Sequence, residues 1–214
     1  LSPIYLALRL LAGSTGEVAI RGVNFADDYY PSNSNPLALT LAGLTVRWRD
    51  RILPLVFVAP DVINAQLPYD APEGEHTLTL QIRNYPSITK PFSISRNAPG
   101  LYADAAFEEP LAIAFHEDGN LVRPDNPARA GETLTLWGTG FGPVEPQPLE
   151  GFLVPSNPPS PLQDTLEFLV DGQVSPHVWA GAAAGQVGIS AVRVRVAAEL
   201  AQTGARSVKI RVNG

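Results

Sequence analysis

The sequence predicts an all-β protein built from two tandem β-sandwiches. Strand-like stretches recur along the 214 residues, and no segment shows convincing helical periodicity. The 21 prolines and 18 glycines are scattered without a period, which is typical of many turns rather than of collagen or a disordered tract. An internal repeat and a length of 214 residues both favour two units, each large enough for a core.

Most of the predicted strands alternate apolar and polar residues, as half-buried antiparallel strands do. In the first unit they are predicted at Glu17–Arg21, Leu44–Trp48, Leu53–Val58, Thr77–Ile82 and Pro91–Ser95. In the second unit they are predicted at Leu111–Phe115, Thr133–Trp137, Leu166–Val170, Ala191–Val196 and Ser207–Val212.

Three segments recur in the same order in both units. GEVAIRGVNF (16–25) resembles GETLTLWGTGF (131–141), PLVFVAP (54–60) resembles PHVWAGA (176–182), and EGEHTLTLQI (73–82) resembles TGARSVKIRV (203–212). We expect Gly22 and Gly138 to make sharp turns at positive φ, so that Phe25 and Phe141 fold back over the end of each sandwich.

The segment SRNAPGL (95–101) is predicted to link the units, because Pro-Gly cannot continue a strand pair. The expected domains are therefore 1–96 and 97–214. A Pro-rich loop at 143–163 is either a solvated insertion or a contact surface.

The two repeats end differently. After TLTLQIRN (77–84) the first unit continues with a further strand in YPSITKPFSISR (85–96), whereas SVKIRVNG (207–214) has no such counterpart. We therefore predict that the second unit lacks its final strand. Its open edge would be flanked by the apolar side chains of the last strong strand, Val208, Ile210 and Val212.

The segment LSPIYLALRL (1–10) could fill such an edge, with strand 3–10 as the donor. Its apolar residues recur at period two and would bury one face; they are Ile4, Leu6, Leu8 and Leu10. The alternative is that this segment is the first strand of its own domain, because SPIYLALR (2–9) aligns with EPLAIAFH (109–116).

Composition and motifs argue against several function classes. The net charge of −6 and the lack of a basic run disfavour nucleic acid as a partner, and no apolar stretch is long enough for a membrane span. Cysteine is absent, the three histidines lack zinc-ligand spacing, and no GxSxG motif occurs. The glycine-rich GTGFG (138–142) precedes Pro143 and a Pro-rich loop rather than a phosphate-binding helix. No catalytic residue, cofactor or metal site is predicted, and the chain is not expected to be an enzyme.

Aromatic residues are candidates for contact with a glycan. Tyr29 and Tyr30 lie in a predicted loop and are the better candidates for an exposed contact. Trp48, Trp137 and Trp179 lie in predicted strands, where tryptophan is expected to belong to the core.

Several segments together resemble a known family. They are VAPDVINAQLPYDAPEGEHTLTLQI (58–82), APGLYA (98–103) and NPARAGETLTLWGTGFG (126–142). They are similar to an uncharacterised C-terminal domain family of large secreted acidobacterial proteins, related to the IPT/TIG immunoglobulin-like fold. The resemblance covers roughly residues 12–214. It implies immunoglobulin-like sandwiches and an extracellular or cell-surface location, and it implies no catalytic residues.

These observations predict a non-enzymatic, extracellular structural protein. Its partner would be a second copy of itself, joined head to tail when strand 3–10 completes the second unit of a neighbour. The alternative is a cell-surface adhesion module that binds a glycan or another surface protein.

Overall fold

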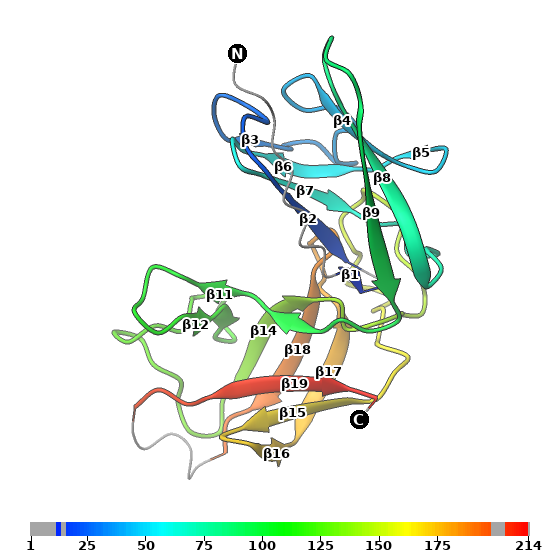
Figure 1. Ribbon diagram of the computed structural model, residues 1–214. Helices are drawn as coiled ribbons and strands as arrows, with labels where there is room; N and C mark the ends of the chain where they lie inside the picture. The colour runs from blue at the N-terminus through cyan, green and yellow to red at the C-terminus, as the bar shows by residue number, and fades with distance from the viewer. Residues whose placement is uncertain (1–11, 14–15, 198–203, 214) are drawn as a thin grey trace.

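The computed structural model describes residues 12–13, 16–197 and 204–213, and it confirms an all-β sandwich fold. No helix occurs among these residues. The strands β1 to β9 form one part of the molecule and β10 to β19 form the other, and the two parts stack end to end (Figure 1). We call residues 12–95 the N-terminal half and residues 96–213 the C-terminal half.

Two sheets face each other in the N-terminal half, and almost all of their strand pairs are antiparallel. One sheet has the order β1 (Ala12–Gly13), β9 (Ile88–Ser95), β8 (Gly74–Ile82), β4 (Leu44–Trp48) and β5 (Arg51–Ile52). The other has the order β2 (Glu17–Arg21), β7 (Val62–Gln66), β6 (Leu55–Val58) and β3 (Tyr30–Pro31). Among the described strands, only β1 pairs in parallel, with β9.

The C-terminal half repeats this plan with fewer strands in one sheet. One sheet has the order β10 (Gly100–Leu101), β14 (Thr133–Thr139), β18 (Ser190–Arg195) and β17 (His177–Ala182), with β13 (Ala114–Phe115) also on β14. The facing sheet has the order β16 (Gln173–Ser175), β15 (Leu166–Val170) and β19 (Val208–Val212). A short pair, β11 (Ala103–Asp104) with β12 (Leu111–Ala112), completes the described strands.

Each half has its own hydrophobic core between its two sheets, and in strands such as β8 and β9 the inward apolar residues alternate with mostly polar outward ones. No sheet of the described residues combines strands from both halves. A third, smaller cluster joins the halves, with Tyr69 packed against Val144, Val154 and Ala182. The number of independently folding domains stays a prediction.

The predicted strands agree with the structure at β2, β4 and β15, whose bounds match. The prediction missed β7, which is a central strand of its sheet. The segment Val62–Gln66 carries Asn64 and Gln66 among its apolar residues, and these polar residues obscure the alternation expected of a strand. Both side chains are accommodated because they hydrogen-bond to groups at the boundary between the halves.

The Gly-turn-Phe motif behaves differently from the prediction in one respect. Gly22 and Gly138 do not have positive φ; the left-handed residues are Asn24 (φ 63°) and Gly140 (φ 71°), two positions later in each motif. A side chain at Gly138 is instead excluded by space, because a Cβ there would lie 2.3 Å from the carbonyl oxygen of Gly100. The expected burial of Phe25 and Phe141 is confirmed.

Gly140 supports a prediction about backbone strain. A Cβ at this position would lie 2.2 Å from the carbonyl oxygen of Ala98, and the left-handed φ adds its own cost. Gly172 has a similar φ of 81° but open space around it. We expect Gly140→Ala to lower the free energy of unfolding by more than the roughly 1–2 kcal/mol expected for Gly172→Ala. Equal losses in urea denaturation would contradict a steric role for Gly140.

The linker is fixed to the C-terminal half, whereas the Pro-rich loop contacts the N-terminal half. In the linker, the backbone N–H of Ala98 donates to the carbonyl of Gly140 (2.9 Å), and Asn97 donates to the carboxylate of Asp164 (2.8 Å). In the loop, the N–H of Gly151 donates to the buried side-chain oxygen of Gln66 (2.6 Å), and its carbonyl accepts from Leu37 (2.7 Å). The loop at 143–163 is therefore a contact surface between the halves.

Candidate functional site

The predicted acceptor strand, β19, pairs with β15 along its whole length. Val208 lies opposite Val170, and Val212 lies opposite Leu166. The alternating sequence VKIRV sends the valines and Ile210 toward the core and the charged residues toward solvent, where Arg211 pairs with Glu167 at 3.0 Å. The solvent face of β19 is thus polar, and its other face belongs to the core.

The second edge of β19 pairs with no other strand that the structure describes. Its counterpart in the sequence repeat is β8, which pairs with β4 on one edge and with β9 on the other. The structure therefore repeats the pair β4–β8 as the pair β15–β19, without a described counterpart of β9. An unpaired edge presents a row of N–H and C=O groups to an additional strand.

The inward side chains of β8 are also more deeply buried than those of β19. Leu78, Leu80 and Ile82 of β8 are only 3%, 3% and 8% exposed. The matching residues of β19 are all half-buried; they are Val208, Ile210 and Val212. In the N-terminal half, Phe92 and Ile94 of β9 help to cover the core. The C-terminal core is correspondingly less covered beside β19.

The predicted donor residues Ile4, Leu6, Leu8 and Leu10 lie outside the residues that the structure describes. A second open edge bears on where they could bind. Among the described strands, β2 pairs only with β7, whereas its counterpart β14 carries β18 on one edge and both β10 and β13 on the other. Residues 2–9 align with the segment that contains β13, and β13 pairs with β14. By analogy, residues 2–9 would pair with the open edge of β2.

The predicted contact residues Tyr29 and Tyr30 are exposed, at 56% and 36%. They are held by separate contacts. The Tyr29 ring lies 5.2 Å from the ring of Phe57, and the Tyr30 hydroxyl donates to Asp27 at 2.7 Å. This hydrogen bond lowers the pKa of Asp27.

Two of the three tryptophans differ from the prediction. Trp48 belongs to the N-terminal core, as expected, and is 2% exposed. Trp137 and Trp179 instead lie on the outer face of their sheet, because Leu136 and Ala180 are the neighbours that enter the core. A strand places successive side chains on opposite faces, and the sequence alone did not identify the covered face.

A buried carboxyl group between the halves was not predicted. Glu17 of β2 is 9% exposed and accepts hydrogen bonds from Asn64 (2.8 Å) and from the hydroxyl of Tyr102 in the C-terminal half (3.2 Å). Burial raises the pKa of Glu17 to about 7, against the opposing effect of the two hydrogen bonds. Its position at the start of an ordinary amphipathic strand gave no signal of this environment.

The titratable groups do not form a recognisable catalytic or metal centre in the described part of the chain. No cluster of three or more His, Cys, Asp or Glu residues that could hold a metal ion occurs there. His116 donates from Nε2 to the carbonyl of Asn126 (3.1 Å), and its Nδ1 is hydrogen-bonded to the carboxyl group of Glu132 (2.9 Å). The hydrogen bond to Glu132 raises the pKa of His116.

The fold and this edge define the chain as an all-β sandwich protein with an open edge at β19 among the described residues. No protein-family model matches the chain, and a search of curated proteins finds no match. No described segment forms a helix with the length and apolar character needed to cross a membrane. The resemblance to the acidobacterial family stays a prediction.

Proposed function

We propose that the protein is a non-enzymatic, extracellular structural protein that assembles by accepting a β-strand at the open edge of β19. The observation that carries this proposal is the difference between β19 and β8, which are counterparts in the repeat. β8 has strand partners on both edges, and its core-facing side chains are buried. β19 has one described strand partner, and its core-facing side chains are only half-buried.

The proposed donor is strand 3–10 of a second copy. Its apolar residues at period two would cover the half-buried face of β19, and its backbone would supply the missing hydrogen bonds. Donor and acceptor lie at different places on the chain, so the contact is heterologous. Repetition of a heterologous contact produces an open filament rather than a closed dimer.

The competing arrangement places strand 3–10 on the open edge of β2 in its own chain. This arrangement would complete the N-terminal half and leave the edge of β19 without that donor. The two arrangements predict different masses in solution, because only the first joins one chain to the next.

The donor face can be tested without changing β19. The variant Leu6→Asp with Leu8→Asp places charges on the apolar face of the donor, whereas Tyr5→Asp with Ala7→Asp places them on the opposite face. We expect the parent chain and the Tyr5/Ala7 variant to grow in mass with concentration in light scattering. The Leu6/Leu8 variant should remain a single chain, because a charge buried without a partner is costly.

A peptide experiment distinguishes the two edges directly. A synthetic peptide of residues 1–11 is added to the chain that lacks these residues, and amide hydrogen exchange is measured. Slower exchange in β19 (208–212) is expected from the proposal. Protection confined to β2 (17–21), or a parent chain that stays monomeric at high concentration, would overturn it.

The alternative function, adhesion to a glycan or surface protein through Tyr29 and Tyr30, has weaker support. Both side chains are exposed, but each is held by a different neighbour and they do not share one contact. We therefore place this alternative second.

A further inference from the structure

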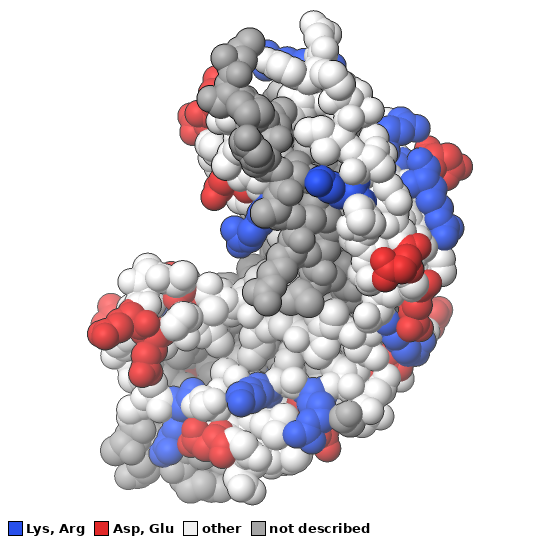
Figure 2. All heavy atoms as spheres, viewed as in Figure 1, with Lys and Arg blue, Asp and Glu red and all other residues white. Residues whose placement is uncertain are grey.

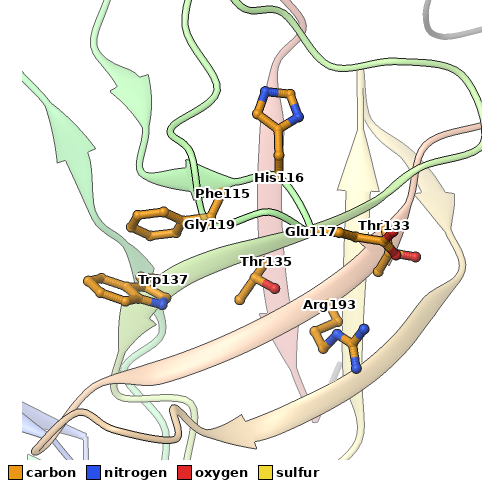
Figure 3. Close-up of a pocket in the computed structure, with 8 residues that line it drawn as sticks. All are labelled: Phe115, His116, Glu117, Gly119, Thr133, Thr135, Trp137 and Arg193. Carbon is orange, nitrogen blue, oxygen red and sulfur yellow. The ribbon is translucent and has the colours of Figure 1, made fainter.

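The outer face of the β14–β18 sheet carries a hollow of about 520 Å³, within the range of small-ligand sites. Its floor contains Thr135 of β14 and Arg193 of β18, which lie directly opposite each other in the strand ladder. Phe115 and Trp137 form one end, and Thr133 and Glu117 lie at the other (Figure 3). The hollow is separate from both the edge of β19 and the boundary between the halves.

The aromatic end of the hollow is not required by the fold. The rings of Phe115 and Trp137 lie 4.5 Å apart at an angle of 49°, and both are half-buried on the face away from the C-terminal core. In the sequence repeat the residue before the turn glycine is Trp137 in one half and the exposed Arg21 in the other. The sandwich fold that the two halves share therefore does not require a large aromatic side chain at this position.

The polar end offers groups that are free to bind a ligand. Arg193 is exposed and has no ion-pair partner among the described residues, although five other arginines of the chain have one. Charged side chains of both signs are spread over the visible face of the molecule (Figure 2). The hydroxyl groups of Thr133 and Thr135 and the carboxylate of Glu117 line the same space as Arg193. His116 is engaged by Glu132 and Asn126, so its role is to hold the turn that carries Phe115 and Glu117.

We propose that this hollow binds a saccharide that carries a carboxylate group, such as a uronic acid unit. The apolar C–H face of a sugar ring fits the aromatic end, and its hydroxyl groups can bond to the threonines and Glu117. Arg193 then receives the carboxylate, since a guanidinium can bind both of its oxygens at once. Nucleic acid fits poorly, because a single arginine on a chain of net charge −6 cannot follow a phosphate backbone.

The test measures binding of two matched probes, tri-galacturonate and the neutral trisaccharide galactotriose, by calorimetry with the full chain. We expect tri-galacturonate to bind at least about tenfold more tightly, in the micromolar to millimolar range. Arg193→Gln should remove this preference, whereas Arg195→Gln is the control, because Arg195 is exposed on the same face of β18 and does not line the hollow.

The aromatic end is tested separately. Trp137→Ala should weaken binding of both probes by about tenfold or more, and Trp137→Phe should weaken it less because a smaller ring remains. Trp179→Ala is the control on the same face. Thermal unfolding verifies that each variant is folded. The proposal is overturned if the parent chain binds neither probe, if Trp137→Phe and Trp137→Ala both leave binding unchanged, or if galactotriose binds as tightly as tri-galacturonate. None of these readouts depends on assembly through β19.

Discussion

Replacing Phe141 by alanine is expected to lower the free energy of unfolding by about 3–5 kcal/mol. The Phe141 side chain is completely buried in the C-terminal core. Its ring lies so close to Gly138 that a Cβ at position 138 would collide with it. The truncation would leave a cavity that this close-packed turn cannot collapse to fill. The turn also accepts a hydrogen bond from Asn97 to the carbonyl of Phe141 (2.8 Å), which ties the core to the linker.

The measurement is urea denaturation followed by tryptophan fluorescence, with Phe152→Ala as the matched control. Phe152 lies in the Pro-rich loop and is 39% exposed, so its loss is expected to cost much less, on the order of 1 kcal/mol. Equal destabilisation by Phe141→Ala and Phe152→Ala would contradict the expectation that the buried Phe141 side chain stabilises the turn.

The second large effect is a dependence of stability on pH that comes from Glu17. Burial raises the pKa of Glu17 from 4.5 to about 7 in the folded protein. Between these two values the folded chain binds more protons than the unfolded chain, so the free energy of unfolding falls as pH rises through this range. The contribution of the neutral carboxyl is complete below about pH 4.5 and is lost by about pH 7, and it amounts to about 3 kcal/mol.

The variant Glu17→Gln isolates this contribution because it resembles the protonated carboxyl at every pH. We expect Glu17→Gln to be more stable than the parent at pH 8 and to lose that advantage as pH falls to 5. The control is Glu108→Gln, since the Glu108 side chain is exposed and a change there should have little effect at either pH. A difference between parent and Glu17→Gln that does not vary with pH would contradict the buried position of Glu17.

The fold class could be predicted from the sequence because strand alternation and turn residues are local signals. EVAIR, LTVRW and LEFLV each carry enough alternation to identify β2, β4 and β15. The segment VINAQ (β7) lacks this alternation. Its polar residues are stabilised by hydrogen bonds with Glu17 and Gly151, which lie far away in the sequence. The internal repeat is a second sequence signal, and it identifies β8 and β19 as counterparts from their residues alone.

The candidate sites depended more strongly on packing between distant segments. The sequence placed Val208, Ile210 and Val212 on one face of a strand, but their partial burial is a property of what covers them. The same holds for Trp137: alternation requires it to face opposite Leu136, and only the position of the facing sheet decides which of the two is exposed. The hollow beside Arg193 follows from that choice.

Two groups of features in this protein thus have different origins. Most of the strands and the repeat are specified locally, because backbone conformation and side-chain period act over a few residues. Tertiary packing is needed to settle which edges among the described strands remain open, which aromatic rings face outward, and that Glu17 lies buried against Tyr102. These properties depend on contacts between segments that are far apart in the sequence, such as Glu17 with Tyr102, and no local pattern in the sequence encodes those contacts.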